Sequence, residues 1–340
     1  MIKIDMYSTA DHVKGQGVGS AYLELIKMLK KHFPDEFDIT INNHRPSDIT
    51  HYHTINLRYY FSTFSKKRGK RIGYVHFLPE TLEGSLNLPK PIKWIFYKYV
   101  IAFYKRMQEI VVVNPTFIPK LEAYGINREK ITYIPNFVSK KEFYPLTAEQ
   151  KSAIREKMGI SKDKFVVVGT GQVQTRKGIL DFARLAEKNP DVTFIWAGGF
   201  SFGKITDGYK KLKRLVDNPP KNLYFPGIVD RDKLFEYYNV ADLFLLPSFN
   251  ELFPMSVLEA FSCGTPVMLR SLDLYKEIIS GYYEPFSTFD EMNSSLKTLM
   301  NNPEKLAEMS QKSLAASDYY SEDHLASIWN KFYKSQIKEG

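Results

Sequence analysis

The sequence predicts an α/β protein of two domains, each built on a parallel sheet with helices on both faces. Short apolar runs alternate with longer segments of helical periodicity along most of the chain, which is typical of strand–helix–strand units. A length of 340 residues is too long for one ordinary core and suits two domains of roughly 150 residues each. The two series of apolar runs therefore indicate two Rossmann-like halves.

Each series contains five predicted strands. They are residues 2–6, 37–41, 49–53, 71–76 and 109–113, then 164–170, 192–197, 223–225, 243–246 and 266–269. Pro135 and Pro145 punctuate the end of the first series, and a polar helix at 148–158 precedes the second. We therefore expect a first domain of residues 1–145, a linker at 143–146 and a second domain of residues 146–320.

The last segment, residues 321–340, is predicted to form a helix. Leu325, Ile328, Trp329 and Phe332 recur there at helical spacing and predict a face that packs on a core. At the other end of the chain, the first residues run directly into a strand, without the pattern of a signal peptide. The single cysteine, Cys263, excludes an internal disulfide framework. Both observations favour the cytoplasm.

Two glutamates follow the predicted strand at 243–246. Glu251 is expected in the loop at its carboxyl end, where ligands bind in open α/β folds, and Glu259 on the following helix. Carboxylates suit sugar and ribose hydroxyls, because each accepts hydrogen bonds from two vicinal O–H groups. The start of that helix offers N–H groups to a diphosphate. The alternative is a solvated loop acid and a helix-capping acid.

Two adjacent cations follow the glycine turn after the strand at 164–170. Arg176 and Lys177 are predicted to open a helix there, where positive charge would stabilise a leaving nucleoside diphosphate. They could instead be solvated residues at a helix start. A second glycine loop, at residues 14–20, has the spacing Gly-x-Gly-x-Gly, which does not match the dinucleotide fingerprint and argues against a dehydrogenase.

The positive charge is concentrated in residues 51–110. This window holds eleven lysines or arginines against three glutamates, so it carries nearly all of the net charge of +9. The segment 90–107 interleaves lysines with Trp94, Tyr97 and Tyr104 on one predicted helix face, with Ile95, Phe96, Tyr99, Phe103 and Met107 on the other. Cations among Trp and Tyr suit a bilayer surface with anionic headgroups. The expected membrane contacts are Lys66, Lys67, Arg68, Lys70, Arg71, Lys93, Trp94, Tyr97, Lys98 and Lys105. Nucleic-acid binding and a merely solvated face are the alternatives.

These segments, taken in order, resemble the retaining GT-B glycosyltransferases of family 4, also called group 1. The family motif Pro-Ser-x-x-Glu-Gly-Phe-Gly-x-x-x-Leu-Glu-Ala-x-x-x-Gly-x-Pro-Val is matched at Glu251, Phe253, Leu258, Glu259, Ala260, Gly264, Pro266 and Val267. Leu252 and Pro254 replace the two glycines of its Glu-Gly-Phe-Gly stretch. In the family's Gly-Arg-x-x-x-x-Lys-Gly stretch, Gln172 replaces the arginine and Lys177 is kept. Residues 130–145 are similar to the family's approach to the interdomain hinge.

The resemblance implies roles for these positions and a fold of two Rossmann-like domains facing across a cleft, with the last helix returning to the first domain. Glu251 would bind hydroxyls of the transferred sugar, Glu259 would hold the ribose, and His76 would contact the sugar or act in catalysis. The remaining donor-site positions are Gly17, Gln172, Arg176, Lys177, Val229, Leu252, Phe253, Pro254 and Met255. The donor would be a UDP-hexose, with no obligatory metal. His51 and His53, which share a strand face, lack a third metal ligand at convincing spacing.

The whole chain is most similar to bacterial enzymes of this family that extend glucosyl-diacylglycerol with a second hexose. The expected acceptor is therefore a glycolipid in an anionic membrane, reached from the cytoplasmic face without nucleic acid as a partner. A transferase for capsule or teichoic acid is the alternative enzyme. From another class, a catalytically silent protein that binds a nucleotide sugar or membrane remains open. The choice between glucose and galactose, the linkage position and the oligomeric state also stay open.

Overall fold

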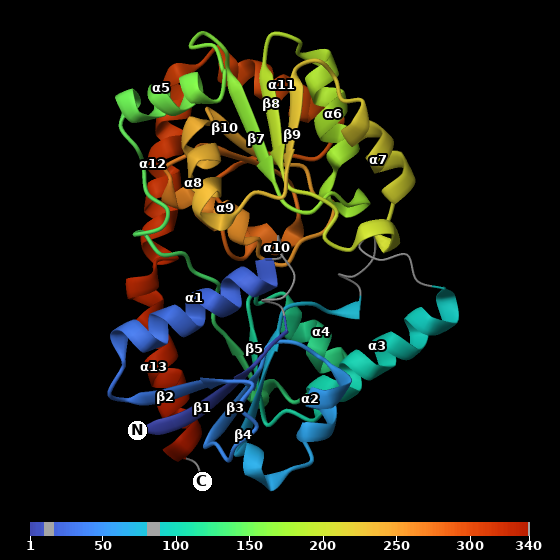
Figure 1. Ribbon diagram of the computed structural model, residues 1–340, viewed down its shortest axis with the longest axis vertical. Helices are drawn as coiled ribbons and strands as arrows, with labels where there is room; N and C mark the ends of the chain where they lie inside the picture. The colour runs from blue at the N-terminus through green and yellow to red at the C-terminus, as the bar shows by residue number, and fades with distance from the viewer. Residues whose placement is uncertain (10–16, 80–88, 339–340) are drawn as a thin grey trace. The chain divides into compact units, whose positions relative to one another are not determined.

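The computed structural model describes residues 1–9, 17–79 and 89–338, which form two compact units (Figure 1). Among the described residues, unit 1 holds 1–9, 17–79, 89–137 and 322–338, and unit 2 holds 138–321. The predicted two-domain α/β class is confirmed, since each unit contains a six-stranded parallel sheet.

The sheet of unit 1 has the order β2-β1-β3-β4-β5-β6. Its strands are β1 (Ile2–Tyr7), β2 (Phe37–Ile41), β3 (Ile49–Tyr52), β4 (Lys70–Val75), β5 (Glu109–Val112) and β6 (Ile131–Tyr133). The helices of this unit are α1 (Gly17–His32), α2 (Leu57–Ser62), α3 (Lys90–Lys105), α4 (Phe117–Ala123) and α13 (Glu322–Lys338), with 3-10 turns at Lys66–Arg68 and Arg128–Lys130.

The last helix belongs to unit 1, although unit 2 separates it from the rest of that unit in sequence. Helix α13 packs against α1, and its Trp329 and Tyr333 are fully buried. Glu322 at its start accepts from Lys31 and lies 2.8 Å from the His32 ring at the end of α1. The core of unit 1 is therefore completed by the end of the chain.

The sheet of unit 2 has the order β12-β11-β10-β7-β8-β9. Its strands are β7 (Val166–Thr170), β8 (Thr193–Ala197), β9 (Leu223–Gly227), β10 (Leu243–Leu246), β11 (Val267–Arg270) and β12 (Glu284–Phe286). The helices are α5 (Ala148–Lys157), α6 (Ile179–Lys188), α7 (Tyr209–Asp217), α8 (Arg231–Val240), α9 (Met255–Ser262), α10 (Asp273–Lys276), α11 (Phe289–Met300) and α12 (Pro303–Tyr319), with 3-10 turns at Thr175–Lys177 and Gly203–Ile205.

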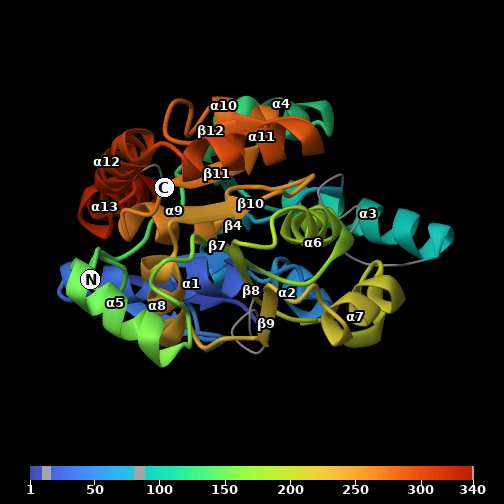
Figure 2. The same cartoon turned by 90° about the horizontal axis from the view of Figure 1, so that it is seen from above.

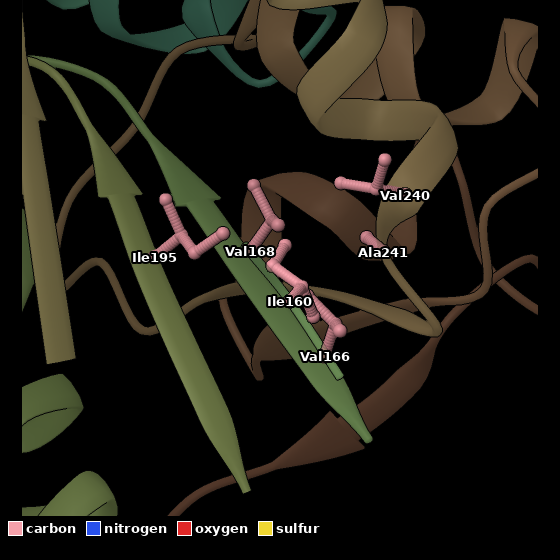
Figure 3. Packing of buried hydrophobic residues seen from close by; sticks show 6 residues of the cluster. All are labelled: Ile160, Val166, Val168, Ile195, Val240 and Ala241. Carbon is pink, nitrogen blue, oxygen red and sulfur yellow. The ribbon is translucent and has the colours of Figure 1, made fainter. Parts of the chain in front are cut away.

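Helices cover both faces of this second sheet. Figure 2 shows α6, α7 and α11 on one side and α5, α8, α9 and α12 on the other. The central strands β7 and β10 are buried at every residue, as expected for parallel strands covered on both faces. Figure 3 shows how Val166 and Val168 of β7 and Ile195 of β8 pack with Val240 and Ala241 at the end of α8.

The order of strands in unit 2 places a topological switch point between β7 and β10. The chain runs from β7 through β8 to β9 on one side, then returns to β10 and continues through β11 to β12 on the other. The loops that follow β7 and β10 therefore leave the sheet in opposite directions and open a crevice at its carboxyl edge. In unit 1 the corresponding reversal lies between β1 and β3.

All ten predicted strands are present, but the sequence analysis missed β6 and β12. Each has three residues and lies at an edge of its sheet, so neither is long enough to give a periodic apolar signal. The segment from Val138 to Pro145, placed above at the end of the first domain, packs with unit 2. Val138 donates to Tyr320, and the Ser262 hydroxyl donates to the carbonyl of buried Phe143.

Candidate functional site

The switch point of unit 2 brings the loop after β7 into contact with the loop after β10. The N–H of Phe249 donates to the carbonyl of Arg176 at 2.7 Å. Gly178 has a φ of 71°, and a Cβ there would lie 2.2 Å from the carbonyl oxygen of Pro247. Only glycine therefore lets the two loops approach this closely.

Three predicted residues, Arg176, Lys177 and Glu251, form one charged cluster at this contact. Lys177 Nζ lies 2.5 Å from Glu251 Oε1, and Arg176 Nη1 lies 3.5 Å from Glu251 Oε2. Arg176 also donates to the carbonyl of Asn250 at 2.9 Å. Lys177 and Glu251 are both buried, whereas Arg176 is half-buried. The cluster is a charged site at the ligand-binding edge of the sheet.

Burial and charge act against each other within this cluster. Burial alone would raise the pKa of Glu251, but the cations of Lys177 and Arg176 outweigh it and hold that pKa below its ordinary value. Burial also lowers the pKa of the Lys177 ammonium, and Glu251 opposes this only in part. Glu251 is therefore an ionised carboxylate that can accept hydrogen bonds from hydroxyl groups.

A row of side chains orients Arg176 from the glycine turn after β7. The Arg176 Nε donates to Gln174 Oε1 at 3.1 Å, and the Gln174 amide donates to Gln172 Oε1 at 2.6 Å. Gln172, predicted as a donor-site residue, is therefore coupled to Arg176 through Gln174. The sequence analysis did not single out Gln174, which is almost fully buried, because a lone glutamine in a loop carries no pattern.

Glu259 lies on α9 and has partners of its own. Arg231 at the start of α8 pairs with Glu259 Oε1, and the Tyr238 hydroxyl donates to Oε2 at 2.6 Å. That hydroxyl also lies 3.0 Å from the hydroxyl of Thr170 at the end of β7. Arg231 and Tyr238 were missed, because they precede Glu259 by more than 20 positions and only the fold brings them to it. Glu259 is thus buried, oriented on both oxygens and placed at the same edge of the sheet.

The residues between the two glutamates divide into core and loop. Phe253 is buried with its ring 5.0 Å from that of Tyr320, and Met255 is buried at the first position of α9. Leu252 and Pro254 are half-buried. Pro254 is the N-cap of α9, a position whose N–H lies outside the helical ladder, so its missing donor costs the helix nothing. It does remove one N–H that the family's glycine would offer to a ligand.

Two other predicted donor-site residues lie in a loop of unit 2 and at a helix start of unit 1. Val229 is half-buried in the loop between β9 and α8, close in sequence to Arg231. Gly17 is the first residue of α1 in unit 1, and the rest of its loop, residues 10–16, lies outside the described residues.

His76, the remaining predicted sugar contact, belongs to a buried group of imidazoles in unit 1. It directly follows β4, and its Nε2 lies 3.5 Å from His53 Nδ1 just beyond β3. His51 on β3 lies 2.7 Å from the Tyr333 hydroxyl of α13. Burial lowers the pKa of His51 and His76 to about 3, and it lowers that of His53 as well. All three rings are therefore neutral at physiological pH.

These histidines do not assemble as a metal site. In the part of the chain that the structure describes, no group of three or more His, Cys, Asp or Glu residues is arranged to hold a metal ion. His51 and His53 instead pack among aromatic rings, with Tyr74 and Trp329 close to His51. Their burial in the core accounts for the alternating spacing of His51 and His53 on one strand face.

The predicted basic surface is present, with one correction. Lys66, Lys67, Trp94, Lys98 and Lys105 are exposed, and Lys70, Arg71, Lys93 and Tyr97 are half-buried. Arg68 is buried, donates to the Tyr7 hydroxyl and the His44 carbonyl, and lies 3.7 Å from Asp5. Its charge serves the interior of unit 1, so the prediction that Arg68 contacts a membrane surface was wrong.

The helical wheel predicted for α3 also needs correction. Ile95, expected to face the core, is 61% exposed, whereas Tyr104, expected on the outer face, is buried and donates to the Phe77 carbonyl. The first half of α3 extends away from the sheet of its unit, so both of its sides meet solvent there (Figure 1). Across the described ranges, no helix has the length and apolarity needed to cross a bilayer.

Both halves of the chain match models of known protein families. Residues 14–142 match the model named Glycosyltransferase Family 4, and residues 150–315 match Glycosyl transferases group 1. The alpha-galactosylglucosyldiacylglycerol synthase of Streptococcus pneumoniae is 53% identical over 340 residues, which is 100% of this chain and 91% of that protein. The processive diacylglycerol alpha-glucosyltransferase of Acholeplasma laidlawii is 32% identical over 51% of this chain and 53% of its own length.

The fold has a solved counterpart. The Anabaena protein HepE, crystallised with UDP and glucose, superposes with a TM-score of 0.80 at 16% identity, over 98% of this chain and 100% of that one. At this identity the likeness concerns the fold alone.

Proposed function

Because the chain belongs to the glycosyltransferases of family 4 and group 1, we propose that it moves a hexose from a UDP-sugar to a membrane glycolipid, with retention at the anomeric carbon. The observation that carries the donor half is the buried cluster of Arg176, Lys177 and Glu251 at the switch point of unit 2. The name of the pneumococcal relative supports glucosyl-diacylglycerol as the acceptor and a diglycosyl-diacylglycerol as the product.

In this proposal Lys177 and Arg176 stabilise the leaving group. When the bond from the anomeric carbon to the phosphate oxygen breaks, its electron pair stays on the diphosphate. Two fixed cations in a buried site stabilise that charge more than water does, because the local dielectric is low. Gln174 and the carbonyl of Asn250 hold the guanidinium of Arg176 in place beforehand.

Glu251 has the second role. Its carboxylate is held in the ionised form by two cations. It can therefore accept hydrogen bonds from hydroxyls of the sugar. The incoming acceptor hydroxyl attacks the anomeric carbon from the face that the diphosphate leaves. Its proton passes to the departing phosphate oxygen, which keeps the charge balanced without a further base.

Glu259 suits the nucleoside. Arg231 and Tyr238 orient both of its oxygens at the edge of the sheet, and a carboxylate fixed in this way can accept from the two hydroxyls of a ribose. The start of α9 at Met255 adds N–H groups that favour the negative charge of a diphosphate. His76 remains the proposed sugar contact from unit 1, and as a neutral imidazole it can donate or accept.

We place the acceptor at the surface of unit 1 formed by α2, α3 and the turn at Lys66–Arg68. Lys98 lies over the ring of Trp94 at 5.1 Å, and Lys93 lies over Tyr97 at 5.4 Å. Cations close to aromatic rings on a helix that meets solvent suit an interface of anionic headgroups and acyl chains, at about 1 kcal/mol for each nearby cation. The protein would then act as a peripheral enzyme on the cytoplasmic face of the membrane.

The test is transfer of label to lipid. The protein is incubated with labelled UDP-glucose or UDP-galactose and vesicles that contain glucosyl-diacylglycerol and phosphatidylglycerol, and the lipids are then extracted. We expect label in a diglycosyl lipid with one of the two donors, and none with Glu251→Gln. Exposed Glu187 on α6 gives the matched control, Glu187→Gln, which should retain activity.

The other outcomes separate the alternatives. UDP-hexose binding without any labelled lipid, but with transfer to a soluble or polymer-linked acceptor, would replace the glycolipid in this proposal. Binding with neither transfer nor hydrolysis would contradict enzymatic activity altogether. Analysis of the anomeric configuration in the product tests retention.

A further inference from the structure

Unit 1 carries an apolar groove between α2 and α3. Its lining residues are Ile55, Leu57, Ile92, Ile95, Phe96 and Tyr99, and its volume is about 450 Å³. Every one of these side chains is aliphatic or aromatic, and the volume lies within the range of small-molecule sites. Leu57, Ile92 and Ile95 are each more than half exposed, so the walls of the groove meet solvent.

The two helices are fixed to one another at both ends of α2. The Tyr99 hydroxyl of α3 donates to the carbonyl of Ile55, just before α2 begins. Beyond the end of α2, Arg106 donates to the Thr63 carbonyl at 3.2 Å and lies over the ring of Phe64 at 4.1 Å. Tyr60 packs beneath, with its ring 5.6 Å from that of Tyr99. The groove is therefore preformed, and a ligand need not order it.

Apolar exposure is concentrated around this groove. Among the described residues sixteen large apolar side chains are exposed, and six of them lie on these helices or directly after α2. These six are Leu57, Phe61, Phe64, Ile92, Trp94 and Ile95. Exposed apolar side chains gathered on two neighbouring helices mark a binding site more often than an ordinary solvated face.

The charge around the groove favours a lipid over a second copy of the chain. Apart from buried Arg68, residues 54–79 and 89–108 contain ten lysines or arginines and no aspartate or glutamate. In a symmetric dimer through this face, each basic patch would lie against the same patch of the partner, and like charges would oppose association. An anionic or sugar-bearing headgroup at a basic rim, with its chain in an apolar groove, satisfies both features at once.

We propose that the groove between α2 and α3 takes one acyl chain of a membrane lipid and that the cations beside it, Arg58, Lys93 and Lys98, face the headgroup region. As the acyl site of the glycolipid acceptor, the groove rests on the proposed function above. It deepens that function, because it makes the enzyme recognise the chain as well as the sugar. A chain drawn partly out of the bilayer would hold its headgroup at the protein surface during transfer.

Matched double variants isolate the groove. Leu57→Gln with Ile95→Gln makes two groove walls polar at exposed positions, and glutamine keeps helix propensity. Leu23→Gln with Ile337→Gln makes the same two substitutions at exposed helical positions of unit 1 outside the groove. Neither pair removes a buried side chain, so both proteins should fold, which circular dichroism checks.

The first readout does not depend on the reaction. Cis-parinaric acid, a fluorescent fatty acid, is titrated below its micellar concentration without vesicles. We expect saturable binding of one molecule per chain, weakened about tenfold by the groove variant because apolar contact is lost, and unchanged in the control variant. Equal binding by both variants would overturn the proposal. So would a concentration-dependent dimer in sedimentation that the groove variant abolishes, since a second copy would then be the occupant.

The second readout compares acceptors. Glucosyl-diacylglycerol with oleoyl chains and the water-soluble form with hexanoyl chains are each offered with the donor. The groove variant should lose about tenfold in kcat/KM on the long-chain acceptor and little on the short one. An equal loss on both acceptors would contradict a chain site while leaving the function intact. Parinaric acid binding that separates the variants, without transfer to either lipid, would keep the groove and refute the proposed function.

Discussion

The two sheets carry opposite chemistry beside their strand ends. In unit 2 the site consists of charges held in pairs, Lys177 with Glu251 and Arg231 with Glu259. In unit 1 the strands β3 and β4 lead into neutral imidazoles, His53 and His76, packed among aromatic rings. Two sheets of similar architecture therefore serve different purposes. In the proposed function, the edge of unit 2 receives an anion and the edge of unit 1 offers hydrogen bonds without charge.

The largest expected effect comes from removing the central charge of unit 2. Glu251→Gln keeps the shape of the side chain but leaves a neutral amide beside Lys177 and Arg176. We expect kcat/KM for hexose transfer to fall about a thousandfold, because the group loses its fixed negative charge. UDP binding, measured by calorimetry, should change much less. Turnover equal to that of Glu187→Gln would refute the role of Glu251.

The cation of the same pair should matter for stability. Lys177→Met leaves the buried carboxylate of Glu251 with Arg176 alone, and breaking a buried pair costs about 3 kcal/mol. Urea unfolding measures the loss, with exposed Lys188→Met on the neighbouring helix α6 as the control. The double variant Lys177→Met, Glu251→Gln should recover part of the loss. If it were less stable than the single variant, the pair would not be the cause.

The neutral histidines of unit 1 should make the free energy of unfolding depend on pH. Burial lowers the pKa of His51 and His76 to about 3 and also lowers that of His53, whereas the unfolded chain binds these protons near pH 6.5. The unfolded state therefore gains more protons on acidification. The stability contributed by the neutral rings is complete above pH 6.5 and is lost as the pH falls toward 3, at about 1.4 kcal/mol per pH unit for each histidine.

The direction of this pH dependence can be tested at one residue. His76→Gln should make the loss of unfolding free energy between pH 6.5 and pH 5 smaller by about 2 kcal/mol. His324→Gln, at an exposed position of α13, provides the matched comparison. Identical slopes for the wild-type protein and His76→Gln would show that the ring is not held neutral by the fold.

The smallest effect is expected at Tyr238. Tyr238→Phe removes the hydroxyl that donates to Glu259 and leaves Arg231 as the partner of that carboxylate. We expect a loss of about 1.5 kcal/mol in thermal unfolding, the lower end of the net contribution of a hydrogen bond to a charged group, because Arg231 still holds the carboxylate. Tyr237→Phe, one position earlier and half-buried, provides the comparison. Equal stability of the two variants would show that Glu259 does not depend on this hydroxyl.

The sequence analysis predicted the elements that have a regular apolar pattern. It missed the short edge strands and the contacts between residues far apart in sequence. Buried parallel strands of four or more residues give continuous apolar runs, which is why β7 and β10 were placed correctly. The edge strands β6 and β12 carry too few residues for such a signal. Glu251 and Lys177 could be found because each lies beside a strand end with glycine or proline nearby, which gives the local sequence a recognisable form.

The partners of these residues could not be found in the same way. Arg231 reaches Glu259 only because α8 and α9 pack together, and no local pattern records that contact. Arg68 lies in a run of cations that indicates an exposed segment. Its side chain is nevertheless buried, because it donates to the Tyr7 hydroxyl and lies beside Asp5. The groove was missed because the residues of its two walls are far apart in sequence. The faces predicted for α3 were partly wrong because the prediction assumed that the whole helix packs on its sheet.

The position of α13 has a consequence for how the protein is made. Translation delivers the strands of unit 1 first, but Trp329 and Tyr333, which complete the core around His51, are synthesised only after the whole of unit 2. Unit 2, which is continuous from Val138 to Ser321, can reach its final packing while the earlier sheet still lacks a wall. Unit 2 is thus ready to fold before unit 1, and the nascent N-terminal strands keep apolar surface uncovered until α13 has been made.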